Sequence, residues 1–260
     1  MERATSRDGT RIAFERVGAG RTVVIVAGLL CDRTTHRALA ERLGERFTAV
    51  TYDRRGRGDS GDTPPYDVQR EVEDLAAVIE ATGGPAAVYG HSSGAGLALL
   101  ACGRRAPITH LVLHEPPYGA EDDTSREEAR SLAARVRAAV ESDCPDVAIR
   151  RFLGSMGMPE DAIEAAAADR RMLHLARTMP YDHSVMDDDA GGTIPVDAAR
   201  RVSVPTLVVA GDKTADFFRH AAEQLVQLIP NARLQLLRGS DHGAPAEVVA
   251  PVIADFCAAS

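Results

Sequence analysis

The amino-acid sequence predicts an α/β fold in which helices cover both faces of a mostly parallel sheet. Short apolar runs alternate with amphipathic helical patterns along the chain, which is typical of parallel strands joined by covering helices. The runs Thr22–Ala27 and Thr206–Ala210 are apolar at almost every position, as expected of strands that are buried on both faces. Hydrophobic residues make up 45% of the 260 residues, which is enough to form a large core.

The predicted strands and helices follow one another in regular order outside the middle of the chain. Each predicted strand is a short apolar run bounded by turn-forming residues. The strands are Arg11–Arg16, Thr22–Ala27, Phe47–Tyr52, Ala86–Tyr89, Ile108–His114, Thr206–Ala210 and Arg233–Leu237. Between them, apolar residues recur every three or four positions, as on one face of a helix. The helices are Thr34–Leu43, Val68–Ala81, Ser93–Arg105, Ala215–Leu228 and Ala246–Cys257.

Residues 118–196 break this alternation, because they contain helical patterns and loops without a convincing strand. Helices are expected at Ser125–Val140 and Asp161–Leu175. An all-helical insertion at this place predicts a lid above the carboxyl edge of the sheet, where open α/β sheets bind ligands. Residues 1–117 and 197–260 then form the core domain. The alternative is an appendage that only extends the core.

The distribution of methionine bears on what the predicted lid covers. All methionines except Met1 fall within residues 118–196. Because methionine is flexible and fills irregular apolar space, this composition suits a small, hydrophobic substrate. Ordinary packing of the lid helices on the core explains the same distribution.

The strongest local signal is the pentapeptide G-H-S-S-G at residues 90–94, which lies between a predicted strand and a predicted helix. A serine on such a sharp turn has a strained backbone, and the positions two before and two after it must be almost free of side chain. Glycines hold both positions for Ser92 but not for Ser93. We therefore predict that Ser92 is a nucleophile and that the backbone N–H of Ser93 binds a developing oxyanion.

The general base for this serine is expected late in the chain. His242 lies in the tetrapeptide S-D-H-G, which follows the last predicted strand and precedes the last helix. This placement gives the chain order nucleophile, acid, histidine. A second oxyanion donor is expected from the loop after Thr22–Ala27, where Gly28 permits a close turn and Leu29 supplies its backbone N–H.

Four motifs in this order make the chain similar to the α/β-hydrolase superfamily over nearly its whole length. They are A-G-L at 27–29 in place of H-G-x, D-R-R-G-R-G-D-S at 53–60 in place of D-x-R-G-x-G-x-S, the turn at Ser92, and D-H-G at 241–243. The resemblance implies the α/β-hydrolase fold and a serine hydrolase that opens an ester, lactone or thioester without a cofactor or metal. It also allows a transacylase, a cyclase, a C–C-cleaving enzyme of small-molecule biosynthesis or a non-catalytic ligand-binding protein.

The acid of the triad departs from the family pattern. The family commonly has G-x-x-D after the next-to-last strand, and here Thr214 stands at the position of that Asp. Glu115 directly follows the preceding strand, and two prolines stiffen the chain after it. We predict that Glu115 is the acid, with a carboxylate oxygen about 2.6–3.2 Å from a ring nitrogen of His242. Asp216 and Asp212 are the alternatives.

Several other functions are disfavoured by the sequence. The formal net charge of −8 disfavours a nucleic-acid partner. Residues 56–61 match G-x-G-x-x-G, but the prolines that follow cannot begin the helix that a dinucleotide site needs. Residues 187–189 are three aspartates that we expect to be solvated rather than to bind a metal. The charged amino terminus and the lack of a long apolar stretch predict a cytoplasmic protein with no membrane partner and with reduced cysteines.

Overall fold

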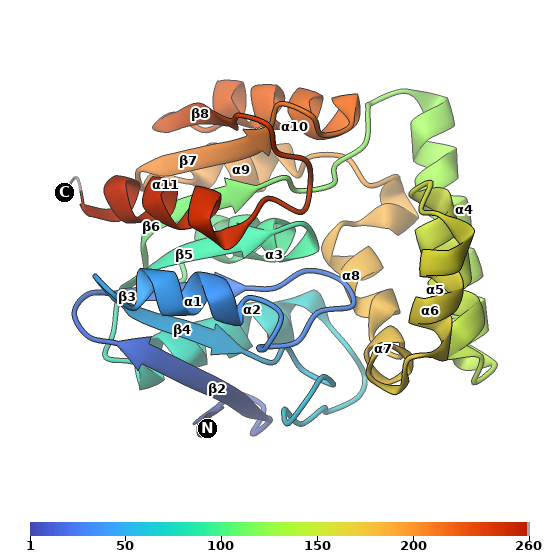
Figure 1. Cartoon of the computed structure of the whole chain (residues 1–260), viewed down its shortest axis with the longest axis horizontal. Coiled ribbons are helices and arrows are strands. Elements are labelled where there is room, and N and C mark those ends of the chain that lie inside the picture. The colour runs from blue at the N-terminus through green and yellow to red at the C-terminus, as the bar shows by residue number, and fades with distance from the viewer. Residues whose placement is uncertain (259–260) are drawn as a thin grey trace.

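The computed structural model describes residues 1–258 and has an eight-stranded sheet at its centre (Figure 1). The strands are β1 (Glu2–Thr5), β2 (Arg11–Gly18), β3 (Thr22–Val26), β4 (Thr48–Tyr52), β5 (Ala86–His91), β6 (Ile108–His114), β7 (Thr206–Gly211) and β8 (Ala232–Leu237). Their order in the sheet is β1-β2-β4-β3-β5-β6-β7-β8. The β1–β2 and β2–β4 pairs are antiparallel and all other pairs are parallel, so the predicted mostly parallel sheet is confirmed.

The strand β1 was not predicted from the sequence. Its four residues, E-R-A-T, pair with β2 alone at the edge of the sheet, and only Ala4 is buried. An edge strand with exposed side chains needs no apolar run, so it lacks the signal by which the other strands were found. The predicted bounds of β6 agree with the observed ones, and those of the other remaining strands differ by one or two residues at an end.

Helices cover both faces of the sheet, as predicted. They are α1 (Arg37–Leu43), α2 (Val68–Ala81), α3 (Ser93–Gly103), α9 (Val196–Arg201), α10 (Asp216–Leu228) and α11 (Ala246–Ala258). Along β3, Val23 and Ile25 point into the core cluster that contains α1 and α11. Val24 and Val26 point into the cluster that contains α2, α3 and α10. Among the described residues no helix is long and apolar enough to span a membrane, and the cytoplasmic location stays a prediction.

The segment 118–196 is helical, as the sequence predicted. Its apolar residues, among them Val136, Ile149 and Met179, form a cluster that Leu30 from the loop after β3 joins. Its helices are α4 (Asp123–Glu141), α5 (Pro145–Ser155), α6 (Glu160–Ala168), α7 (Arg170–Ala176), α8 (Met179–Val185) and the short 3₁₀ helix η1 (Asp188–Ala190). The prediction of one helix over Asp161–Leu175 is wrong. Asp169 ends α6, and its side chain accepts the N–H of Met172 and so caps α7. Figure 1 shows α4–α8 gathered on the side toward which the parallel strands point.

Candidate active site

Ser92 lies on the turn between β5 and α3 in a backbone conformation that residues other than glycine rarely adopt. Its φ is 57° and its ψ is −130°, and such strain is typical of functional turns. A Cβ at Gly90 would lie 2.5 Å from Ala95 Cα, and a Cβ at Gly94 would lie 2.3 Å from the carbonyl oxygen of Val26. The turn therefore needs both glycines, which is the physical reason for the spacing seen in the sequence.

Glu115 directly follows β6, and its carboxylate reaches His242 in the loop between β8 and α11. Glu115 Oε2 lies 2.6 Å from His242 Nδ1, within the range expected from the sequence. The same carboxylate accepts the backbone N–H of Gly211 at 2.7 Å and the hydroxyl of Thr214 at 3.1 Å. Thr214, at the position where the family commonly has its acid, therefore supports the carboxylate of Glu115.

The surroundings of Glu115 keep its carboxylate ionised. The residue is 0% exposed, and burial by itself raises the pKa of a carboxyl group. The hydrogen bonds from His242 and from the backbone of Gly211 outweigh burial and hold the pKa of Glu115 below its ordinary value. An ionised acceptor at Nδ1 keeps a proton on that nitrogen and leaves Nε2 of His242 as the basic atom.

Neither of the alternative acids contacts His242. Asp216 pairs with Arg219 on the surface, where its side chain is 83% exposed. Asp212 accepts the backbone N–H of Gly239 at 2.7 Å and thereby stabilises the turn after β8. Of the carboxylates considered from the sequence, the structure brings Glu115 alone to the histidine.

The ring of His242 is held between two other rings. It stacks on His91 at a centroid distance of 4.6 Å and on Phe218 at 4.4 Å. His91 Nε2 also donates to the carbonyl oxygen of His242 at 3.0 Å. Burial lowers the pKa of His91 well below its ordinary value, so this ring stays neutral beside His242. Ser92 and His242 are not hydrogen-bonded to each other here, and such contacts often tighten only when substrate binds.

His91 was not recognised as a functional residue in the sequence. It occupies a variable position of G-x-S-x-G, and its contacts with His242 join residues 151 positions apart. Only the folded chain shows that the neighbour of Ser92 also contacts His242 and its loop.

Two histidines near this site make the free energy of unfolding depend on pH. Burial lowers the pKa of His36 and of His114 to about 4, and both Nε2 atoms are buried with no hydrogen-bond partner among residues 1–258. The unfolded chain takes up both protons near the ordinary pKa of about 6.5, and the folded chain does so only at lower pH. Stability is therefore lost as the pH falls below about 6.5.

Between pH 6 and pH 5 we expect the free energy of unfolding to fall by about 2 kcal/mol through these two histidines. Urea unfolding at each pH measures the total fall, to which the buried, neutral His91 also contributes. His114→Gln removes one of the two groups, so its stability should fall less steeply over this interval. An unchanged dependence of the free energy of unfolding on pH in that variant would contradict a lowered pKa for His114.

The two predicted oxyanion donors lie beside Ser92. Ser93 is the first residue of α3, so its backbone N–H has no acceptor within the helix. The loop that contains Leu29 comes close to Ser92, because a Cβ at Gly28 would lie 2.9 Å from Ser92 Cβ and 3.5 Å from Ser92 Oγ. The structure thus places Ser93 and the loop of Leu29 at the same turn, and the binding of an oxyanion by their backbone N–H groups stays a proposal.

A group of buried charged residues next to this site was missed in the sequence. Arg54 and Arg57 lie at variable positions of the motif over residues 53–60, and Asp182 lies in α8. Their meeting depends on contacts across more than 120 residues, which no local pattern reveals. Ser93 also has a role beyond its backbone, because its hydroxyl donates to Asp182 at 2.7 Å.

The aspartates at residues 187–189 do not form a metal site in the structure. Within residues 1–258 no three His, Cys, Asp or Glu side chains are arranged to hold a metal ion. Asp188 instead lies 2.5 Å from His183 Nδ1, and Asp189 pairs with Arg137 at the surface.

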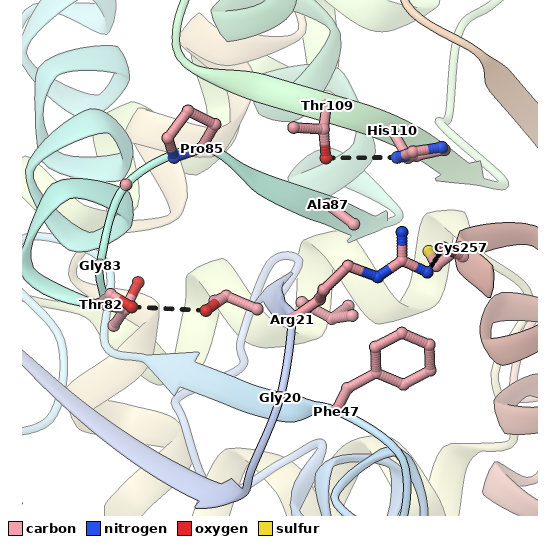
Figure 2. Close-up of a pocket in the computed structure, with 13 residues that line it drawn as sticks. Gly20, Arg21, Phe47, Thr82, Gly83, Pro85, Ala87, Thr109, His110 and Cys257 are labelled. Atoms are coloured by element: carbon pink, nitrogen blue, oxygen red, sulfur yellow. Dashed lines mark hydrogen bonds between the residues drawn. The ribbon is translucent and has the colours of Figure 1, made fainter. Parts of the chain in front are cut away.

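A cavity of about 390 Å³, whose lining residues are drawn in Figure 2, lies at the amino ends of the parallel strands, away from the candidate active site. Its lining includes Arg21, whose guanidinium donates to the carbonyl oxygen of Cys257 at 2.5 Å, together with Thr109 and Ala87. These residues lie at the amino ends of β3, β5 and β6, and none of the candidate catalytic residues lines the cavity. Ligands of parallel sheets bind at the carboxyl ends, so we assign no function to this cavity.

The chain is similar in sequence to a polyketide synthase and to a hydrolase, among other proteins. It is 32% identical over 252 residues to the polyketide synthase ThaQ of Burkholderia thailandensis, a match that covers 90% of this chain but only 11% of that much longer protein. It is 27% identical over 235 residues to a 2-(acetamidomethylene)succinate hydrolase of Mesorhizobium japonicum, which covers 86% of this chain and 82% of that one.

Comparisons with a solved structure and with a family model identify the family of this chain. A solved alpha/beta hydrolase from Sphaerobacter thermophilus is 43% identical to this chain and superposes with a TM-score of 0.88 over 98% of this chain and 100% of that one. A family model described as the alpha/beta hydrolase family matches residues 23–252. That match covers most of the sequence, and the chain belongs to the alpha/beta hydrolase family.

Proposed function

We propose that this protein is a serine hydrolase that opens an ester, lactone or thioester of a small, hydrophobic molecule through an acyl-enzyme on Ser92. The observation that carries the proposal is the 2.6 Å contact between Glu115 and His242, beside the strained turn of Ser92. Membership of the alpha/beta hydrolase family supports it, because the positions of the nucleophile, the acid and the histidine follow the chain order of that fold.

The proposed reaction begins with transfer of the Ser92 Oγ proton to His242 Nε2 as Oγ attacks the carbonyl carbon. The backbone N–H groups of Leu29 and Ser93 bind the oxyanion that forms. When the tetrahedral adduct collapses, His242 gives its proton to the leaving group and an ester of Ser92 remains. Water, deprotonated by His242, then releases the acid. Glu115 stays ionised throughout and offsets the charge of the imidazolium.

A panel of p-nitrophenyl esters of increasing acyl length, with matched lactones and thioesters, tests the proposal. We expect turnover that a fluorophosphonate abolishes by reacting with Ser92. A protein that hydrolyses none of these compounds and does not react with the probe would instead be a ligand-binding member of the fold.

A second candidate keeps the same residues but ends in transacylation, cyclisation or C–C cleavage within small-molecule biosynthesis. The similarity to a segment of a polyketide synthase favours it. Turnover in water enriched in ¹⁸O separates hydrolysis from transacylation and cyclisation, because water places one labelled oxygen in the released acid and transfer to another nucleophile places none there. C–C cleavage by water also labels the acid, and its leaving group, which is bonded through carbon instead of an alcohol or thiol, distinguishes it.

We further propose that residues 118–196 act as a lid over the site. Leu29, the predicted oxyanion donor, packs against the apolar cluster of this segment, as does the half-buried Met172. Helices that contact the loop beside the nucleophile are well placed to shape the acyl pocket.

Met172→Ala is expected to change the preference for acyl chain length by about 10-fold, because one or two methylene groups in an apolar pocket contribute about 1–3 kcal/mol. The ratio of kcat/KM between long and short esters measures the change. Met156→Ala is the matched control, since Met156 is 43% exposed and lies outside that cluster. Unchanged selectivity in Met172→Ala, with only the melting temperature lowered, would indicate that Met172 only packs the helices of this segment on the core.

A further inference from the structure

Two arginines and one aspartate form a buried charged cluster between the nucleophile turn and α8. Arg54, Arg57 and Asp182 are each 1% exposed. Asp182 Oδ1 accepts Arg54 Nη1 at 2.5 Å and Ser93 Oγ at 2.7 Å, and Oδ2 accepts Arg57 Nη2. Glu71 binds the other edge of Arg54 through both carboxylate oxygens at 2.7 Å. Two positive charges thus meet two negative ones, and the cluster has no excess charge to attract an ionic ligand.

Arg57 also binds the peptide group from which one proposed oxyanion donor projects. Its Nη1 donates to the carbonyl oxygen of Gly28 at 2.7 Å and to that of Cys31 at 3.1 Å. Because a trans peptide is planar, its C=O and N–H point in opposite directions. A guanidinium that holds the Gly28 oxygen therefore fixes the direction of the Leu29 N–H, away from Arg57. The same peptide borders the nucleophile, as the 2.9 Å approach of a Gly28 Cβ to Ser92 shows.

Asp182 is what keeps Arg57 in this place. Burial raises the pKa of Asp182, but the charges of Arg54 and Arg57 hold it below its ordinary value, so the carboxylate is ionised. Among the described residues, Asp182 is the carboxylate paired with Arg57. A buried guanidinium without its counter-charge is costly and tends to move toward water. Thr178 Oγ1, just before α8, accepts the Nε–H of Arg57 at 2.9 Å. The helical insertion therefore binds this side chain through two residues, Thr178 and Asp182.

We propose that Arg57 and Asp182 are positioning residues of the oxyanion hole. Asp182 holds Arg57, and Arg57 holds the Gly28–Leu29 peptide in the orientation in which Leu29 donates to the oxyanion. The inference rests on the proposed serine hydrolase function and deepens it, because it makes the insertion a structural part of the catalytic site. Neither side chain touches the reacting carbonyl.

Arg57→Lys tests this role with Arg55→Lys as its control. A lysine keeps the charge but cannot bind Asp182, Thr178 and two carbonyl oxygens at once. Arg55 is a matched arginine of the same loop: it is 0% exposed and binds Asp74 at 2.7 and 2.8 Å, without contact to the oxyanion loop.

We expect Arg57→Lys to lower kcat by about 10²-fold with little change in KM, as for loss of one oxyanion donor. The inhibition constant of an alkyl boronic acid, which forms a tetrahedral adduct on Ser92, should rise by about the same factor. Arg55→Lys should lose comparable stability in urea and keep its kcat and its boronic acid affinity. Asp182→Asn should show the kinetic pattern of Arg57→Lys, and it serves as the test if Arg57→Lys does not fold.

The outcomes separate this inference from the proposed function. A folded Arg57→Lys or Asp182→Asn with the kcat of the wild type overturns the inference and leaves the hydrolase proposal intact. Equal losses of kcat in the Arg55 and Arg57 variants also overturn it, because the cluster then acts through general stability. A wild-type protein without Ser92-dependent turnover overturns the proposed function, and the inference falls with it.

Discussion

Ser92→Ala is expected to lower kcat by about 10⁴-fold or more while the protein remains folded. Alanine leaves no atom to attack the carbonyl, and only the oxyanion hole and substrate binding then accelerate the reaction. The rate is measured on the best ester of the panel, and thermal melting confirms that the variant is folded.

The neighbouring serine provides the control for this experiment. Ser93→Ala keeps the backbone N–H and loses the hydrogen bond to Asp182, which contributes about 1.5–3 kcal/mol to stability because its acceptor is charged. We expect a lower melting temperature and a far smaller loss of kcat than in Ser92→Ala. If Ser93→Ala were the less active variant, the nucleophile would be assigned to the wrong residue.

Glu115→Gln is expected to lower kcat by about 10²–10⁴-fold. Glutamine has the same shape, but it lacks the negative charge that stabilises the imidazolium, and its amide N–H₂ can favour the wrong tautomer of His242. The effect should appear in kcat rather than in KM, because the charge on the imidazole develops only in the transition state. Steady-state kinetics on the same ester measures it.

Asp216→Asn and Asp212→Asn should both stay near the activity of the wild type. Asp216 lies on the surface beside Arg219, and Asp212 holds a turn. A large loss in either variant, with an active Glu115→Gln, would show that the acid is taken from the loop after β7. Ser92 and His242 would then keep their assigned roles.

Much of the fold could be predicted because its signals are local. Strands buried on both faces must be apolar along their whole length, so β3 and β7 are visible as runs of sequence. The turn at Ser92 is visible because two glycines are forced by close contacts with the neighbouring backbone. Glu115 could be found because a strand end, two prolines and a threonine at the usual acid position all lie in short stretches of the sequence.

Other features depend on tertiary contacts and left little trace in the sequence. The helix α8 has seven residues, which is too short for an apolar period to show, and its Asp182 has meaning only beside Arg54 and Arg57. The helix α5 was not predicted, although the sequence contains a signal for it. Pro145 stands in its first turn, where proline is favoured. His91 meets the loop of the base only after folding.

Mass spectrometry of the protein after reaction with a fluorophosphonate tests the central claim most directly. We predict one covalent adduct per chain, located on the peptide that contains Ser92 and missing from Ser92→Ala. Glu115→Gln should form the same adduct more slowly, because its base is weakened. An unmodified wild-type protein, or an adduct on a residue other than Ser92, would contradict the assignment of Ser92 as the nucleophile.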